Sequence, residues 1–268
     1  DKLTAFNSDG FTLGADATGT GICNVSGNSM AAWCWDAGTS TVTNTSGSIT
    51  STVRASASSG FSVVSFTTQS SGTATVGHGL NVAPAFIIQK IRTLTTDWYC
   101  YHTSIGAANT INLNTTGASS AASIIWNSTA PTSTVWTLGN GWAGSYSTIA
   151  YCFAPVSGYS SMGSYVGNGS SDGPFVYTGF RPRWILLKST SIVGQWGVWD
   201  TARNTFNVSD TRLSPNLGNA EISQSAVAID ILSNGFRIKN SDSDSNQSGA
   251  TYAYACFSEN PFSIARAR

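Results

Sequence analysis

Apolar and polar residues alternate over short stretches of the chain, and Gly, Asn, Ser and Asp separate these stretches. Residues 97–103 (DWYCYHT) and 195–201 (QWGVWDT) alternate large and smaller side chains, which is typical of half-buried strands. Residues 85–90 (AFIIQK) and 183–188 (RWILLK) are apolar runs that end in lysine, and we expect core strands whose ends reach solvent. The pattern therefore predicts many short strands.

Two further segments carry a hairpin signal. Asp9-Gly10 precedes the alternating stretch FTLG, and Asn234-Gly235 precedes the alternating stretch FRIK. Such dipeptides favour the tight turns that join antiparallel strands. Short strands at this spacing, with turn residues between them, predict an all-β protein built from tandem β-sandwich or jelly-roll-like domains.

An internal repeat of about 100 residues organises the chain. At an offset of 98 residues, Pro84 matches Pro182 and Trp98 matches Trp196. The segment STIAYCFAPV likewise matches TYAYACFSENPF further along the chain. The repeat is longer than the roughly 20–50 residues of a solenoid unit, so it predicts tandem domains rather than a solenoid.

The first 59 residues match only the second half of this repeat. Residues 5–14 match 230–239, and residues 24–35 match 246–257. Two explanations stay open: the chain is the C-terminal part of a longer protein, or strands of another subunit complete the half-repeat. The expected organisation is a half-repeat at 1–59, one sandwich at 60–161, a second at 162–263 and a tail at 264–268.

Composition and charge exclude several classes of protein. Only 10% of the 268 residues are charged, and 13 Lys and Arg balance 13 Asp and Glu. A nucleic-acid-binding protein needs a basic patch, which these scattered cations do not form. The chain has no apolar run long enough to insert into a membrane. Ser, Thr, Asn and Gly replace the charges and predict a neutral, hydroxyl-rich surface with little long-range field.

Residue types that carry catalysis are scarce. The only histidines are His78 and His102, and His102 matches Asp200 in the repeat, so we expect neither to be catalytic. Glycoside hydrolysis needs two carboxylates that flank the sugar bond. Asp200 and Asp230 lie in strand-like surroundings and are the candidates for such a pair, but a local role on backbone N–H groups is the preferred interpretation. The prediction is a protein without enzymatic activity and without a cofactor.

The five cysteines do not predict a disulfide framework. Cys34, Cys152 and Cys256 occupy the same position of the repeated strand, and Cys100 matches Val198, so we expect small buried hydrophobes. No cysteine or histidine pair has metal-ligand spacing. Cys23 has no partner in the repeat, and its role stays open.

The segment 240–249 (NSDSDSNQSG) alternates Asp and Asn as calcium loops do. Gln247 occupies the position where such a loop needs glycine, and no glutamate closes the segment. A hairpin loop is therefore the preferred interpretation, and a calcium site is the alternative.

Trp126, Trp136 and Trp142 lie in one loop-rich stretch that has no equivalent in the second repeat. Trp98 and Trp196 recur on repeated strands, which core packing explains first. A ring face beside Asn and Asp side chains is how lectins hold sugars. We therefore expect the three unrepeated tryptophans to contact a ligand or a partner.

A family likeness rests on motifs in a fixed order: SDGFTLG, ATVGHGLNVAPAFIIQK, AYCFAPVSGYSSMGSYVGNG, AIDILSNGFRIK and YAYACFSENPF. Together they resemble a repeat module of uncharacterised function that is common in virion proteins of tailed bacteriophages, especially marine ones. Those proteins are often labelled tail-fibre or LamG-type, lectin-like proteins. The resemblance covers nearly the whole chain and supplies no catalytic residues.

The resemblance implies a non-enzymatic structural or adhesion protein of a phage particle, on a tail fibre, spike or appendage. Such a protein is made in the host cytoplasm and carried on the virion. Its expected partners are copies of itself in a homo-oligomer such as a trimer, other virion proteins and host-surface glycan. Neither nucleic acid nor membrane insertion is expected. The alternatives are a capsid decoration or cement protein, and a carbohydrate-binding module or glycan depolymerase.

Overall fold

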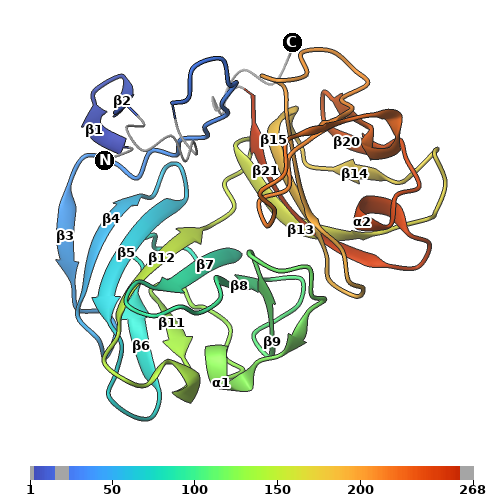
Figure 1. The fold of residues 1–268 in the computed structure, drawn as a ribbon. Coiled ribbons are helices and arrows are strands. Elements are labelled where there is room, and N and C mark those ends of the chain that lie inside the picture. The colour runs from blue at the N-terminus through green and yellow to red at the C-terminus, as the bar shows by residue number, and fades with distance from the viewer. Residues whose placement is uncertain (1–2, 16–23, 260–268) are drawn as a thin grey trace. The chain divides into compact units, whose positions relative to one another are not determined.

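The computed structural model describes residues 3–15 and 24–259 (Figure 1). Strands make up 42% of the chain and helices 6%, which confirms the expected all-β class with β-sandwich architecture. The chain divides into two compact units, Asp1–Trp35 and Asp36–Arg268. The second unit holds both sandwiches, which we call module 1 and module 2. Cys23 and the expected tail at 264–268 lie outside the described residues.

Module 1 is a sandwich of one large and one small antiparallel sheet. The small sheet is formed by β6 (Ala74–Gly77) and β11 (Val135–Leu138), and α1 (Ser123–Trp126) and η1 (Asn140–Trp142) lie beside it. The large sheet has the order β10 (Ser120–Ala121), β9 (Asn109–Asn112), β8 (Tyr99–His102), β7 (Phe86–Ile91), β12 (Ser147–Phe153), β5 (Phe61–Thr67), β4 (Ser51–Ser56) and β3 (Thr41–Asn44).

Module 2 repeats this plan with fewer strands. Its larger sheet has the order β13 (Ser160–Val166), β21 (Thr251–Ser258), β15 (Pro182–Ser189) and β16 (Trp196–Asp200). The opposite sheet has the order β14 (Phe175–Tyr177), β20 (Gly235–Ile238) and β19 (Ile229–Leu232). The remaining elements are β17 (Thr211–Arg212), β18 (Ile222–Ser223), η2 (Ser225–Val227) and α2 (Ser243–Asn246).

The two modules share the hydrogen-bond register of their central strands. In module 1, β12 lies between β5 and β7, and Cys152 pairs with Ile87. In module 2, β21 lies between β13 and β15, and Cys256 pairs with Ile185. The repeated cysteine therefore occupies the same place in each sheet. Both thiols are free and buried, as expected, and burial raises the pKa of Cys152 to about 12. The third equivalent cysteine, Cys34, is free but exposed, so the expectation that it is a buried core residue is wrong.

The start of module 1 differs from the sequence expectation. β3 pairs with β4, and β4 pairs with β5, so residues 41–56 belong to the large sheet of module 1. The expected boundary at residues 59 and 60 is therefore wrong, and the compact unit begins at Asp36. Within residues 3–15 and 24–259, module 2 has no strand beyond β13 at this edge. Because β3 and β4 have no repeated counterpart, matching the repeats to each other could not assign them.

The side chains of β21 alternate between two buried faces. Tyr252, Tyr254 and Cys256 face the core of module 2. On the opposite face, Ala253 and Ala255 line a small apolar gap that module 1 closes. Strand alternation thus explains why this eight-residue strand is buried along nearly its whole length.

That second face joins the modules. Phe257 of β21 meets Phe153 of β12 edge to face, with 5.7 Å between the ring centroids. The indole Nε1 of Trp196 donates to the carbonyl of Asn112 at 2.9 Å. The backbone N–H of Ser119 donates to the carbonyl of Thr190, also at 2.9 Å. The two sandwiches therefore pack against each other through both apolar and hydrogen-bonded contacts.

Of the two lysines that end the apolar runs, Lys188 does not reach solvent as expected, whereas Lys90 is half-buried. Lys188 is buried, and its Nζ donates to the carbonyls of Ser189 and Thr116, the latter in module 1. Burial lowers the pKa of Lys188 to about 8. Lys90 likewise folds back, onto the carbonyls of Ile91 and Leu94. Each ammonium thus donates to backbone carbonyls, and that of Lys188 reaches across to module 1.

His102 is a buried polar contact between the modules. Its Nε2 lies 3.1 Å from the carbonyl oxygen of Tyr254, and its Nδ1 accepts from the backbone N–H of Ser104. This arrangement requires a neutral ring with its proton on Nε2. Burial accordingly lowers the pKa of His102 to about 4.

We expect acid to destabilise the protein through His102. In the unfolded chain this ring takes up a proton near pH 6.5, but in the folded chain only near pH 4, so stability is complete above pH 6.5 and falls as the pH drops towards 4. The expected loss is roughly 3 kcal/mol. Urea unfolding from pH 7.5 to 4 measures it, and His102→Gln should remove most of it. Equal pH dependence in wild type and His102→Gln would contradict this role.

Candidate functional site

A polar pocket of about 600 Å³ lies in module 2. We call it the Arg212 pocket. Its walls come from β17, η2 and the segment that links β20 to α2, and its polar lining includes Arg212, Gln224, Ser225, Lys239, Asp242 and Asp244. Residues that are distant in the chain meet here because β17 pairs with β18 just before η2 begins.

The guanidinium of Arg212 holds the two carboxylates of the pocket. Its Nη1 lies 3.0 Å from Oδ2 of Asp242 and 3.1 Å from Oδ2 of Asp244. The Arg212 side chain is only 5% exposed, and its Nε is buried without a hydrogen-bond partner. A single arginine thus bridges both acids at the wall of the pocket.

The Asp- and Asn-rich segment folds around its own backbone. The side chain of Asn240 accepts from the N–H of Asp242 and from the hydroxyl of Ser245, both at 2.9 Å. Asp242 is the N-cap of α2 and accepts from the N–H of Asp244. Asp, Asn and Ser favour such local hydrogen bonds. The segment is thus a capped turn whose two acids contact Arg212. The expected hairpin loop is wrong, because β20 and β21, which the segment joins, belong to different sheets.

Within the described parts of the chain, no group of three or more His, Cys, Asp or Glu could hold a metal ion. No helix among these residues is long and apolar enough to cross a membrane.

The pocket can hold a neutral, hydrogen-bonding ligand. Arg212 and Lys239 balance Asp242 and Asp244 in charge, so the lining has no net attraction for an anion or a cation. Gln224, Ser225 and Ser241 add amide and hydroxyl groups that both donate and accept. No aromatic ring is among the described residues that line the pocket, so a sugar held by them would bind without stacking.

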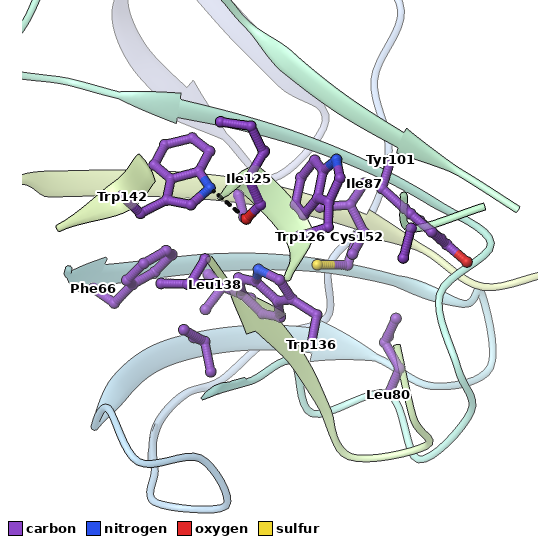
Figure 2. Packing of buried hydrophobic residues seen from close by; sticks show 14 of the residues in the cluster. Phe66, Leu80, Ile87, Tyr101, Ile125, Trp126, Trp136, Leu138, Trp142 and Cys152 are labelled. Atoms are coloured by element: carbon purple, nitrogen blue, oxygen red, sulfur yellow. Dashed lines mark hydrogen bonds between the residues drawn. The ribbon is translucent and has the colours of Figure 1, made fainter. Parts of the chain in front are cut away.

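The three tryptophans that the sequence offered as contacts lie in the core of module 1 (Figure 2). Trp126, Trp136 and Trp142 are each no more than 2% exposed. The Nε1 of Trp136 donates to Oε1 of Gln89 at 2.9 Å. The expected surface contact is therefore corrected, because these rings fill the space between the two sheets.

Their packing explains why module 1 needs them. Trp126 and Trp142 lie 6.5 Å apart, and the Nε1 of Trp142 donates to the carbonyl of Ile125 at 3.0 Å (Figure 2). Phe66 of β5 meets Trp136 edge to face at 5.6 Å. The three rings therefore fill much of the core of module 1, whose small sheet has only two strands.

The other candidates have local roles. Asp200 is buried, accepts from the N–H groups of Ala202 and Arg203, and pairs with Nε of Arg203 at 2.7 Å. The preferred interpretation, a carboxylate that serves nearby backbone, therefore describes Asp200. His78 is buried, its Nδ1 accepts from the N–H of Leu80, and burial lowers its pKa. Asp230 lies on β19, half-buried.

Sequence reasoning did not anticipate Arg212. It lies 30 residues before Asp242, on a two-residue strand that carries no alternating pattern. The sequence does show the acidic segment at 240–249. A search of the chain for an arginine or lysine to pair with its carboxylates could have suggested Arg212.

The comparisons with known proteins add one relationship. The family described as "Domain of unknown function (DUF7483)" has a model that matches residues 1–261. The chain belongs to the DUF7483 family. The DUF7483 match includes the first unit, both modules and the Arg212 pocket. No curated protein and no solved structure matches the chain significantly.

We expect Arg212→Met to destabilise this DUF7483 chain by roughly 3 kcal/mol or more, because it leaves two close carboxylates without their cation. Urea unfolding at pH 7 measures the loss. Arg183→Met is the matched control: that side chain is half-exposed and lies 3.8 Å from Glu259, so its loss should stay below about 1 kcal/mol. Similar effects of the two substitutions would refute the role given to Arg212.

Proposed function

We propose that this DUF7483 protein is a non-enzymatic structural or adhesion protein of a bacteriophage particle, on a tail fibre, spike or appendage. The junction between the modules is the observation that carries the proposal. Aromatic rings and backbone hydrogen bonds join two sandwiches that share one arrangement of strands. Such a junction suits a structural protein, which has to hold its domains in place under mechanical load. The ordered motifs that resemble phage virion modules give the biological setting.

The use of charge supports the same proposal. The guanidinium of Arg203 contacts Asp200 and Glu221, and that of Arg212 contacts Asp242 and Asp244. These ion pairs join parts of the chain that are distant in sequence and stabilise its turns. A structural protein uses charged side chains in this way.

Exposed apolar side chains on an edge strand support contacts with other proteins. β14 is the edge of its three-stranded sheet, and it exposes Phe175 and Tyr177. An open edge with apolar side chains is a place where another chain can pair or pack. Copies of this chain, in a homo-oligomer such as a trimer, and other virion proteins are the partners that we propose for it.

Gold-labelled antibodies against the chain should bind purified phage particles from the source culture, at the tail or its appendages. Mass spectrometry of the same particles should identify its peptides. Label on the capsid shell would favour the alternative of a decoration or cement protein. If particles contain neither label nor peptides while the lysate contains the protein, the virion assignment fails.

A second candidate function is the binding of host-surface glycan in the Arg212 pocket. The neutral, hydroxyl- and amide-rich lining is the observation that favours it. It is compatible with an adhesion role, since many weak sites on one particle add up to strong attachment.

A glycan array, followed by titration calorimetry on the best glycan, tests this second candidate. Gln224→Trp should fill the pocket and weaken binding at least about tenfold, which corresponds to one lost hydrogen-bonded contact or more. Asn219→Trp, exposed and outside the lining, should leave affinity unchanged. No glycan bound, or equal binding by the two variants, would reject the pocket. Release of reducing ends from host polysaccharide would instead indicate a depolymerase.

A further inference from the structure

β6 and β14 are equivalent strands of the two modules. β6 pairs with β11 so that Val76 lies opposite Trp136, and β14 pairs with β20 so that Val176 lies opposite Phe236. Two positions after the end of each strand, a glycine has a positive φ, +73° in module 1 and +85° in module 2. The outer edges of β6 and β14 can therefore be compared position by position.

In module 1 this edge is covered by the chain itself. The N–H of Ile49 donates to the carbonyl of Thr75 at 3.0 Å, and the N–H of Thr75 donates to the hydroxyl of Ser48 at 2.8 Å. The hydroxyl of Ser51 donates to the carbonyl of Gly77 at 3.1 Å. An extended segment thus satisfies the backbone groups of β6 that point away from β11.

In module 2 the equivalent backbone groups are those of Phe175 and Tyr177. The N–H of Ile238 donates to the carbonyl of Pro174 at the start of β14. Hydrogen-bonded and non-hydrogen-bonded pairs alternate along an antiparallel ladder, so the N–H and C=O groups of Phe175 and Tyr177 point away from β20. In the described parts of the chain, no hydrogen bond reaches these groups. The edge that module 1 covers is therefore open in module 2.

The side chains at the open edge are also of a different kind. Thr75 and Gly77 of β6 correspond to Phe175 and Tyr177 of β14, which are 43% and 67% exposed. Both rings lie on the face of the sheet opposite to Val176, which packs in the core. Unpaired backbone groups beside exposed aromatic rings form a template on which another strand can pair.

We propose that β14 pairs with β14 of a second copy of this chain, antiparallel and about a two-fold axis beside Val176. The inference rests on the proposed assembly into a homo-oligomer and names the surface that this assembly uses. Phe175 and Tyr177 flank Val176 symmetrically, so Phe175 of each copy lies opposite Tyr177 of the other. Each of these two pairs exchanges both of its N–H and C=O groups, because the groups of both residues point outward.

A second copy matches this edge in backbone, side chains and charge. The two facing Phe–Tyr pairs are aromatic pairs across neighbouring strands, which stabilise a sheet. β14 contains no charged residue, so two copies do not repel each other here. The pairing joins the three-stranded sheets of the two copies into one continuous sheet. The contact is small, so it suits copies that a larger assembly holds close together.

Disulfide trapping between two variants tests the proposed register. All proteins in this experiment carry Cys23→Ser and Cys34→Ser. The remaining native thiols, Cys100, Cys152 and Cys256, are buried, so a new surface cysteine is the group that reacts under mild oxidation.

A mixture of Phe175→Cys and Tyr177→Cys proteins should form a disulfide-linked dimer at least about tenfold faster than either protein alone. The facing Cα atoms of such a pair are about 5.5 Å apart, within reach of a disulfide, whereas two copies of the same position lie diagonally, more than about 7 Å apart. Phe206→Cys is the matched control. Phe206 is 83% exposed and precedes Asn207, whose side chain bonds to β19 at the other side of the sheet. Mixed with Tyr177→Cys, it should link no faster than the single variants.

A proline variant separates strand pairing from mere contact of side chains. Phe175→Pro, added to the Tyr177→Cys protein, removes an N–H that makes no bond to β20, so the module keeps its own sheet. Circular dichroism verifies that it folds. Mixed with Phe175→Cys, this protein should link at least about tenfold more slowly than Tyr177→Cys alone does with the same partner.

Equal rates in the Phe175→Cys and Tyr177→Cys mixture and in the separate proteins overturn the proposal. Equally fast linkage in the Phe206→Cys control also overturns it, because contact is then not confined to β14. The same holds if sedimentation of the unsubstituted chain shows a trimer as its only assembly, since a two-fold pair joins copies two at a time. If the mixed disulfide forms but phage particles lack the protein, the virion assignment alone fails.

Discussion

Each sandwich of this DUF7483 chain depends on a central strand that is hydrogen-bonded on both sides. β12 and β21 are the last strands of their modules in the chain, and each inserts between two strands that come early. The insertion joins the start of a module to its end and buries the repeated cysteine. Without both neighbours, the backbone groups of such a strand have no partners, and its apolar face has no sheet to complete.

The same strand also builds the contact between the modules. Because successive side chains of β21 point to opposite faces, Tyr252 and Tyr254 fill the core while Ala253 and Ala255 face module 1. Small residues on that face let the sheet of module 1 approach closely. His102 and Lys188 then use their polar groups on carbonyls at or near this contact. Lys188 is thus one of the few charged side chains of this protein, and it binds backbone carbonyls.

The sequence predicted those strands that a local alternating pattern or the internal repeat marks. Alternation located the strands around Trp98 and Trp196, the Asn-Gly turn located β19 and β20, and the repeat located β12 and β21 as equivalents. It failed where no repeated counterpart exists. The repeat pattern places β3 and β4 in the preceding half-repeat, and it predicts surface contacts for Trp126, Trp136 and Trp142. In both cases only the packed sheet shows where the residues belong.

The Arg212 pocket illustrates a second limit. The acidic segment at 240–249 can be recognised in the sequence. Whether it binds a metal ion depends on whether a side chain of the protein or an ion from the solvent pairs with its carboxylates. That partner, Arg212, is brought in by the fold from 30 residues away. Lys188 shows the same limit, since a lysine at the end of an apolar run is expected in solvent until a neighbouring module covers it.

Amide hydrogen exchange across the whole chain, read by mass spectrometry, tests the dependence on two-sided pairing most directly. If that dependence holds, the amides of β12 and β21 are the most protected in the protein, and those of the edge strands β3 and β14 exchange far faster. Protection of β3 and β14 comparable to that of β12 and β21, in the monomeric chain, would contradict it.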